Sequence, residues 1–270
     1  MPFRAIHIER RDGVAIVSLN RPDKANALDD TLWQELRAAR EACDESPDVR
    51  VVVLAGEGRH FCAGIDLGML MGVQAAIQDD CEARKREKLR RLIIELQATA
   101  SSLERCGKPV IAAIHGACVG GGLDIALAAD FRFAAQDAVF SVRELDLAMV
   151  ADIGTLQRLP RIVGEGVARE LVLTARDVGA IEAQEIGLVN RVYPDVSALR
   201  VAALSCAQQI AARSPLAVRG CKQVLNFSRD HSVADGLEYV ATWNAAMLLS
   251  EDLPQAAMAM ASGTPPRFRD

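Results

Sequence analysis

The stretch Lys108–Pro160 constrains what this chain can fold into more than any other part of the sequence. An apolar run, Val110–Ile114, is followed by the glycine triplet Gly120–Gly122 and then by the alanine- and leucine-rich segment Leu123–Ala129. This order predicts a buried strand, a turn and a helix that begins on glycines. The first N–H groups of such a helix have no partners within it, and the helix dipole is positive there. We therefore expect this turn to hold a negatively charged group.

Three acidic residues with apolar neighbours follow the glycine triplet, namely Asp124, Glu144 and Asp152. Carboxyl groups beside a turn that holds an oxyanion are suited to moving protons next to a carbonyl group. Simpler roles remain open for all three. Glu144 could lie in a solvated loop. Asp124 could have a purely structural role, in which it stabilises the start of its own helix. Asp152 could cap a helix that begins near Gly154-Thr155.

Composition and charge limit the remaining classes of function. The chain has 270 residues, of which 50% are hydrophobic and 25% charged, as is typical of a globular protein with a large core. Its net charge of -5 argues against non-specific nucleic-acid binding, and no apolar run approaches the roughly 18 residues of a membrane span. Seven scattered cysteines without a C-x-x-C pair predict reduced thiols and no zinc site. Without an apolar leader at its start, we expect a cytoplasmic protein.

The remaining segments predict a mixed α/β protein whose last part is helical. The segments 5–9 and 14–20 on either side of Asp12-Gly13 predict a β-hairpin. The β-branched run 51–55 predicts a buried strand. Helices are expected over residues 31–43, 79–106, 167–174, 181–186, 196–212, 215–226 and 233–249.

Four short motifs follow one another along the chain. They are Asn20–Leu28, Phe61–Leu67, His115–Asp130 and Gly154–Pro160. In this order and spacing they resemble the crotonase family, also called the enoyl-CoA hydratase/isomerase superfamily, over nearly the whole length. The resemblance implies an α/β, crotonase-like spiral of ββα units over residues 1–195 that binds acyl-CoA. It also implies a C-terminal helical region over residues 196–270 that builds a homotrimer or a homohexamer.

The resemblance implies that the substrates are acyl-coenzyme A thioesters, and that two backbone amides, those of Ile65 and Gly121, hold the thioester oxygen. Removing a proton from the carbon beside a thioester leaves an enolate, whose charge gathers on the carbonyl oxygen. Two preset donors stabilise such a charge by on the order of 3 kcal/mol each. The alternative is that Gly120–Gly122 only permit close packing of a strand and a helix.

Further contacts to the coenzyme A part of the substrate are implied at residues of the first three motifs. The set comprises Lys24, Ala25, Ala27, Cys62, Ala63, Gly64, Ile65, Asp66 and Gly121. Lys24 and Arg21 could meet its phosphates, which would give an acidic protein a local positive spot for a polyanion. No separate cofactor and no metal ion are expected, because coenzyme A is part of the substrate and carboxyl groups transfer the protons.

Asp124, Glu144 and Asp152 together resemble the acids of the dienoyl-CoA isomerase branch of this family. Such an isomerase would shift the conjugated double bonds of a 3,5-dienoyl-CoA to the 2,4 positions. We expect Asp152 to act as the base at C2, Glu144 as the acid at C6, and Asp124 to orient or tune them. Two alternatives stay open. One is an enoyl-CoA hydratase, in which Asp124 and Glu144 hold the attacking water, and the other is a non-catalytic binding protein with the same fold.

Overall fold

A six-stranded sheet forms the centre of the computed structural model, which describes residues 3–270. Its strands lie in the order β1 (Ile6–Arg11), β2 (Val14–Leu19), β3 (Val51–Gly56), β4 (Val110–Ile114), β6 (Phe131–Ala135) and β9 (Arg191–Tyr193). β1 and β2 are antiparallel around Asp12-Gly13, so the predicted hairpin is confirmed. Every other neighbouring pair of strands is parallel. Met1 and Pro2, the first residues of the predicted core, lie outside the described residues.

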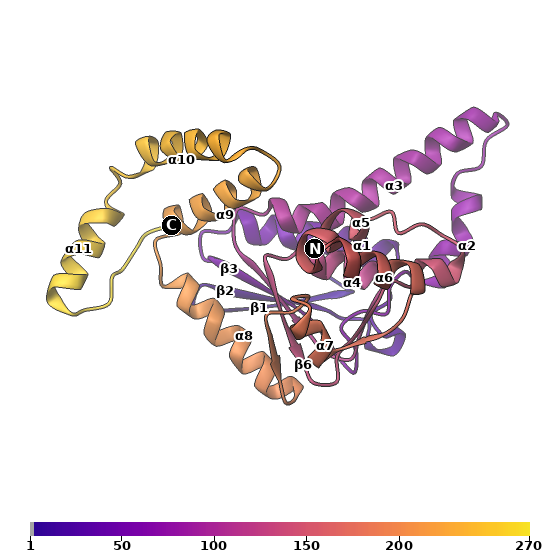
Figure 1. The fold of residues 1–270 in the computed structure, drawn as a ribbon, viewed down its shortest axis with the longest axis horizontal. Coiled ribbons are helices and arrows are strands. Elements are labelled where there is room, and N and C mark those ends of the chain that lie inside the picture. Colours follow the sequence, from indigo (N-terminus) through magenta and orange to yellow (C-terminus); the bar gives the residue numbers. More distant parts are fainter. Residues whose placement is uncertain (1–2) are drawn as a thin grey trace.

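Helices cover both faces of this sheet (Figure 1). On one face lies α8 (Val196–Ala211), and on the other lie α1 (Asp30–Glu45), α3 (Glu82–Arg105) and α4 (Gly121–Leu127). In β3, Val51 and Val53 belong to the core beneath α8. Val52 and Leu54, which point the other way, belong to the core beneath α1 and α3. A strand buried on both faces needs an apolar residue at every position, which accounts for the unbroken run in β3.

A smaller sheet of three strands lies beside the glycine triplet. β5 (Ala117–Val119) pairs in parallel with β7 (Val139–Ser141), which pairs antiparallel with β8 (Val178–Gly179). An isolated bridge joins Cys62 to Cys118 of β5. This bridge brings the second motif, Phe61–Leu67, against the glycine triplet, although the two segments are distant in the sequence.

The other elements connect and extend these layers. They are the 3-10 helices η1 (Pro22–Lys24) and η2 (Arg143–Leu147), and the helices α2 (Leu67–Ala76), α5 (Thr155–Val163), α6 (Glu165–Thr174), α7 (Ala180–Glu185), α9 (Pro215–Arg229), α10 (Val233–Met247) and α11 (Asp252–Ser262). All the predicted helices are present, with ends that differ by up to three residues. No helix within residues 3–270 combines the length and the apolar character needed to cross a membrane.

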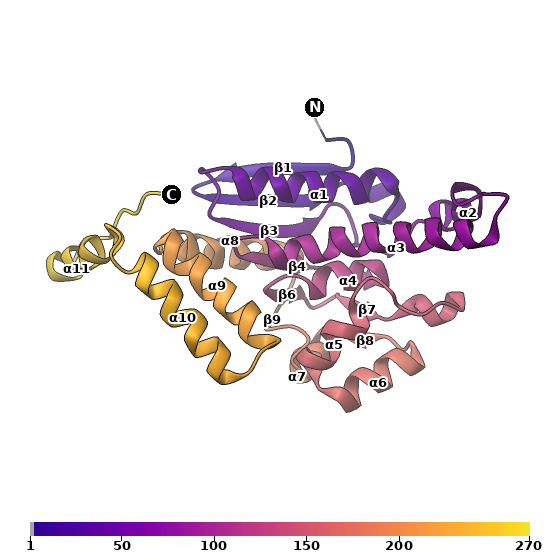
Figure 2. The same ribbon diagram turned by 90° about the horizontal axis from the view of Figure 1, so that it is seen from above.

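Of the last three helices, α10 and α11 reach away from the sheets, as Figures 1 and 2 show, whereas α9 lies against the main body of the fold. The hydroxyl of Ser214 accepts a hydrogen bond from the Ala217 N–H at 3.2 Å and caps α9, with Pro215 in its first turn. Apolar side chains stand exposed along these helices, among them Leu225, Val233, Leu237, Leu249, Leu253, Met258 and Met260. A mixed α/β fold with a C-terminal helical region is confirmed. The spiral arrangement and the division after residue 195 stay predictions, and α8 packs on the main sheet.

Candidate active site

Two turns from distant parts of the chain pack against each other beside the small sheet. The first turn, residues 62–66, is joined to β5 by a hydrogen bond from the Val119 N–H to the Cys62 carbonyl at 3.1 Å. The second is Gly120–Gly122. Gly64 has a φ of 92°, and a methyl group on it would lie 3.0 Å from the Val119 carbonyl oxygen. Only glycine adopts this backbone conformation without cost at such a close approach, so Gly64 allows the two turns to meet.

The turns present two backbone amides that lack an acceptor. The Gly64 carbonyl accepts a hydrogen bond from the Leu28 N–H at 2.8 Å. Because a trans peptide points its C=O and N–H in opposite directions, the Ile65 N–H faces away from Leu28. Within residues 3–270, neither the Ile65 nor the Gly121 N–H donates a hydrogen bond. A methyl group on Gly121 would lie 3.8 Å from the Ile65 nitrogen, so both amides border one small space that could hold an oxyanion.

Asp124 lies in the first turn of α4 and is fully buried. Its Oδ1 accepts hydrogen bonds from the N–H (2.6 Å) and the hydroxyl (2.7 Å) of Thr155, the first residue of α5. Asp124 therefore caps α5 across the fold. Its other oxygen, Oδ2, is buried and finds no partner among the described residues. Burial raises the pKa of Asp124 to about 6, although the two bonds from Thr155 oppose this shift.

Glu144 lies in η2 and reaches back to the glycine turn. A methyl group on Gly120 would lie 3.4 Å from its Oε1, which places the carboxyl group beside the free amides. Its Oε2 is buried and has no partner within the described part of the chain. Burial raises the pKa of Glu144 to about 7, and negative charge on Asp124 adds to the shift. Glu144 is therefore protonated in a substantial fraction of the molecules at neutral pH.

Asp152 lies between η2 and α5 and keeps access to solvent. The N-cap of α5 is Gly154, and the carboxylate that binds the first N–H of this helix is that of Asp124, so the cap alternative for Asp152 is wrong. The Asp152 carbonyl accepts a hydrogen bond from Gln97 Nε2 at 2.6 Å. Burial by the protein around it raises the pKa of Asp152. Its charge adds to the raised pKa of both Asp124 and Glu144, so the three acids lie within electrostatic reach of one another.

The raised pKa of Glu144 makes stability depend on pH in a defined direction. The folded chain binds the proton of the Glu144 carboxyl group more tightly than the unfolded chain does. The protonated carboxyl group therefore contributes to the free energy of unfolding at low pH, and this contribution is lost as pH rises from about 4.5 to about 7. We expect Glu144→Gln to raise the free energy of unfolding at pH 8 by about 2 to 3 kcal/mol. At pH 4 the variant and the wild type should differ little. Urea unfolding at both pH values measures this difference.

Glu165→Gln is the matched control for this prediction. Glu165 begins α6 and pairs with Arg169 at 3.2 Å, and their side chains are 73% and 74% exposed. Exposed pairs of this kind contribute under about 1 kcal/mol, so the control should change little at either pH. If Glu144→Gln raised the free energy of unfolding equally at pH 4 and pH 8, the proposed titration of Glu144 would be contradicted.

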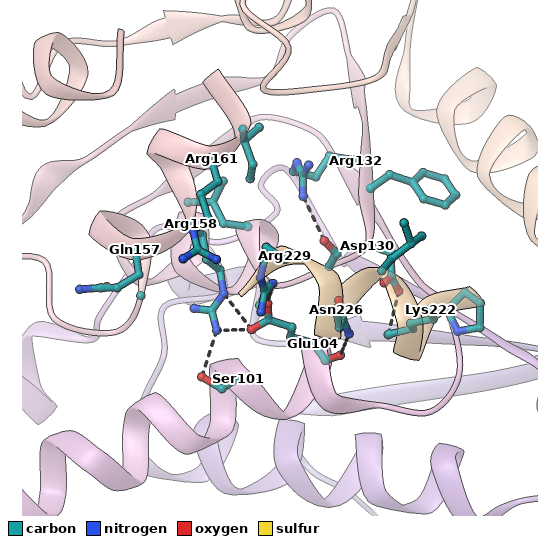
Figure 3. A pocket seen from close by; sticks show the side chains of 18 of the residues that line it. Ser101, Glu104, Asp130, Arg132, Gln157, Arg158, Arg161, Lys222, Asn226 and Arg229 are labelled. Carbon is teal, nitrogen blue, oxygen red and sulfur yellow. Dashed lines mark hydrogen bonds and ion pairs between the residues drawn. The ribbon is translucent and has the colours of Figure 1, made fainter. Parts of the chain in front are cut away.

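A cavity of about 850 Å³ lies between α3, α5 and α9 (Figure 3), and the segment Asp152–Gly154 lines part of it. Its wall is strongly charged. Arg158 of α5 binds Glu104 of α3 at 2.8 Å, and Lys222 of α9 binds Asp130 at 2.8 Å. Pockets for apolar ligands are lined mainly by apolar and aromatic side chains. We therefore assign the candidate active site to the two turns and the three acids, and not to the bulk of this cavity.

Arg158 was not expected from the sequence, yet the structure places it near the acids. A methyl group on Gly154, which has a φ of 138°, would collide with its guanidinium group. Glycine in the fourth motif therefore lets Arg158 lie across the start of α5. Burial dominates the raised pKa of Asp124, and the charge of Arg158 opposes it. The spacing of four residues between Gly154 and Arg158, one helical turn, was the only local signal for this contact.

The residues predicted to contact coenzyme A lie around the first turn. The Ala63 N–H donates to the Ala25 carbonyl at 3.0 Å, and Lys24 is exposed on η1. The thiol of Cys62 is fully buried and donates to the Asn26 carbonyl at 3.1 Å. Burial raises the pKa of Cys62 to about 12, so no thiolate forms there at neutral pH. The contacts to coenzyme A stay predictions.

Arg21 is the exception, because it is engaged within the protein. Its guanidinium group binds Asp29 and Asp66 at 3.1 Å each. Two carboxylates already bind it, which leaves fewer of its donors for a phosphate, and the expected contact of Arg21 with a phosphate stays a prediction. Lys24, which is exposed, stays a predicted phosphate contact as well.

Two free amides near three carboxyl groups with raised pKa values make up the candidate site, and this set of groups suits an enzyme that moves protons next to a carbonyl group. A family profile described as Enoyl-CoA hydratase/isomerase matches residues 9–261, and the chain belongs to this family. The resemblance carried by the four motifs is thereby confirmed.

Individual proteins of known name show which members of the family the chain is similar to. The chain is 49% identical over 271 residues to the peroxisomal Delta(3,5)-Delta(2,4)-dienoyl-CoA isomerase of Arabidopsis thaliana, with 98% of this chain and 97% of that protein covered. It is 46% identical over 244 residues to the mitochondrial Delta(3,5)-Delta(2,4)-dienoyl-CoA isomerase of Homo sapiens, with 90% and 74% covered. Among solved structures, an enoyl-CoA hydratase from Bacillus anthracis matches with a TM-score of 0.90 and 33% identity, over 98% of this chain and 99% of that chain.

Proposed function

We propose that the protein is an isomerase that converts 3,5-dienoyl-CoA thioesters to 2,4-dienoyl-CoA thioesters. One observation carries the proposal: Asp152 lies within electrostatic reach of Asp124 and Glu144, and Glu144 lies beside the two free amides. Holding one water molecule needs two acids, whereas moving two double bonds needs acids at separated points of the acyl chain. The names of the relatives at 49% and 46% identity support the same function.

The reaction takes one proton out and puts one proton in, without a redox change. The carboxylate of Asp152 removes a proton from C2, and the electron pair spreads over the diene and onto the thioester oxygen. The N–H groups of Ile65 and Gly121 donate to that oxygen. Glu144 then gives its proton to C6, which leaves double bonds at C2 and C4. Because Asp152 keeps access to solvent, exchange with water can restore the starting protonation states.

The pKa values fit these roles. A pKa of about 7 lets Glu144 carry a proton at neutral pH and release it during the reaction. Asp124, with a pKa of about 6 and its Oδ1 held by Thr155, is charged for most of the time at neutral pH and strengthens the hold of Glu144 on its proton. Coenzyme A enters only as part of the substrate.

Gly121→Ala tests the amide pair. The added methyl group would lie 3.0 Å from Leu28 Cδ1 and 3.8 Å from the Ile65 nitrogen, at the border of the space proposed for the oxyanion. Alanine keeps the N–H, but its methyl group crowds this space and pushes the thioester oxygen away from the two donors. We therefore expect kcat to fall by up to about 10²- to 10³-fold, the loss typical of one missing oxyanion donor. The melting temperature should change little, because the methyl group meets the flexible end of a leucine. Steady-state kinetics and thermal unfolding measure both effects, and an unchanged kcat would remove Gly121 from this role.

One observation favours enoyl-CoA hydratase as a second candidate. Within the described residues, Asp124 Oδ2 and Glu144 Oε2 are both buried without partners, and a water molecule held between them would satisfy both. Purified protein assayed in parallel with a 2-enoyl-CoA and a 3,5-dienoyl-CoA separates the two candidates. The isomerase predicts much faster conversion of the dienoyl substrate. Much faster water addition to the 2-enoyl-CoA would overturn it in favour of the hydratase.

The same assay tests the non-catalytic alternative. A binding protein with this fold would turn over neither thioester, and RNA retained on a filter at physiological salt would then support it. The net charge of -5 counts against RNA binding, because backbone phosphates attract basic surfaces.

We also propose that the chain assembles as a homotrimer or a homohexamer. Val233, Leu249 and Met260 on and between the last helices are 80%, 91% and 86% exposed in the isolated chain, and such apolar surface indicates a contact. Sedimentation at micromolar concentration should give three or six times the chain mass of 29.1 kDa, and a monomer would contradict assembly. The cytoplasmic location stays a prediction, since the names of the two relatives give peroxisomal and mitochondrial locations.

A further inference from the structure

Arg21 holds a set of polar contacts that the proposed chemistry does not use. Its Nη2 binds Asp29 Oδ2 and Asp66 Oδ2, both at 3.1 Å. Its Nη1 donates a hydrogen bond to the Ala27 carbonyl. The side chain is 18% exposed. A guanidinium group presents several donors in one rigid plane, and here that plane joins three acceptors from two separate segments.

Each carboxylate that binds Arg21 also caps a helix. Asp29 Oδ1 accepts a hydrogen bond from the Leu32 N–H at 2.8 Å and caps α1. Asp66 Oδ1 accepts one from the Gly68 N–H at 2.9 Å and caps α2. The second oxygen of each carboxylate is the one that binds Arg21. Arg21 therefore links the first residues of two helices that lie far apart in the sequence.

The bridge between Leu28 and Ile65 lies between these two caps. The Leu28 N–H donates to the Gly64 carbonyl at 2.8 Å, and the Leu28 carbonyl accepts from the Asp66 N–H at 3.0 Å. The first of these bonds sets the plane of the Gly64–Ile65 peptide and so the direction of the Ile65 N–H. Arg21 holds the residues on both sides of Leu28, Ala27 and Asp29, and joins them to Asp66.

We propose that Arg21 is a positioning residue of the amide pair, because its clamp on Ala27, Asp29 and Asp66 fixes the Leu28–Ile65 bridge and thereby aims the Ile65 N–H at the oxyanion. Arg21 acts through this peptide plane and does not touch the reacting atoms of the thioester. A hydrogen bond weakens steeply as its angle departs from linearity, so a small rotation of the plane is enough to weaken the donor. The inference rests on the proposed function, in which an enolate forms at this position.

Three variants separate this role from a general loss of structure. Arg21→Met removes the charge and the fork of donors, whereas Arg21→Lys keeps the charge and loses the fork. Arg40→Met is the matched control. Arg40 lies on α1, is 17% exposed, and also binds two carboxylates, Glu41 at 3.3 Å and Asp44 at 3.2 Å.

We expect Arg21→Met to lower kcat for the dienoyl substrate by about 10- to 100-fold, less than complete loss of an oxyanion donor, with KM within about threefold of the wild-type value. The kcat of Arg21→Lys should lie between those of the wild type and Arg21→Met. Arg40→Met should keep the wild-type kcat and lose a similar amount of thermal stability. If Arg21→Met does not fold, Arg21→Lys carries the comparison.

The carbonyl stretching band of a bound saturated acyl-CoA, labelled with ¹³C at the thioester carbon, gives a readout independent of turnover. Hydrogen bonds to this oxygen weaken the C=O bond and move the band to lower frequency. We expect this shift in the wild type and in Arg40→Met, and a smaller shift in Arg21→Met. An equal shift in all three proteins, or a kcat of Arg21→Met equal to that of the control, would overturn the inference. A wild type without dienoyl turnover would instead overturn the proposed function, and the band would still report on Arg21.

Discussion

Asp152→Asn should lower kcat for dienoyl-CoA isomerisation by about 10³-fold or more, while the affinity for the substrate stays within about threefold of the wild-type value. Asparagine has the shape of aspartate but cannot take up the C2 proton. The one hydrogen bond that anchors Asp152 to α3 comes from Gln97 to the backbone carbonyl, which the substitution keeps. The amides of Ile65 and Gly121 are also unchanged. Single-turnover kinetics and equilibrium binding of the dienoyl-CoA measure the two quantities separately.

Asp146→Asn provides the control. Asp146 lies nearby in η2, pairs with Arg143 at 3.4 Å and has a side chain that is 56% exposed. Removing this exposed charge should leave kcat near the wild-type value. If Asp152→Asn instead lost affinity as much as it lost rate, Asp152 would hold the structure of the site and not move a proton.

Glu144→Gln should also lower kcat, by about 10²- to 10⁴-fold, because no acid remains to protonate C6. It should nevertheless keep one partial reaction. Asp152 still removes the C2 proton, the two amides still hold the enolate, and the solvent access of Asp152 allows its proton to exchange. In ²H₂O, the variant should therefore place deuterium at C2 of the 3,5-dienoyl-CoA without forming product. Asp152→Asn should neither place deuterium at C2 nor form the 2,4-dienoyl product.

Proton NMR of the recovered substrate follows this exchange. The pair of variants decides which acid is the base. Exchange at C2 that survives in Asp152→Asn and disappears in Glu144→Gln would reverse the two roles. Loss of exchange in both would mean that the acids act only as a coupled pair.

Elements with a local signal could be predicted from the sequence. Asp12-Gly13 marks the hairpin turn, the unbroken apolar run marks β3, and Ser214-Pro215 marks the start of α9. The pair of free amides at Ile65 and Gly121 could also be predicted, because each lies in a motif whose glycine has a physical reason to be there. Their role as oxyanion donors stays a prediction. By contrast, β5, β7 and β8 have only two or three residues each, which is too short for a periodic pattern.

Contacts between distant segments could not be predicted in this way. Asp124 caps α5 and not α4 because the fold brings Thr155 to its Oδ1, and no local pattern signals that pairing. The charge of Arg21 predicts a phosphate contact, but the sequence does not show that Asp29 and Asp66 bind its guanidinium group. A residue type indicates which chemistry is available, whereas its partners decide which of these chemistries it performs.

Conversion of a 3,5-dienoyl-CoA by the wild-type protein in ²H₂O is the most direct test of the proposed chemistry. A base at C2 and a separate acid at C6, which exchanges with solvent, predict a 2,4-dienoyl-CoA that carries deuterium at C6 and no oxygen from water. Mass spectrometry and NMR of the product locate the label. A 3-hydroxyacyl-CoA product, or a 2,4-dienoyl-CoA without deuterium at C6, would contradict proton transfer by two separated acids.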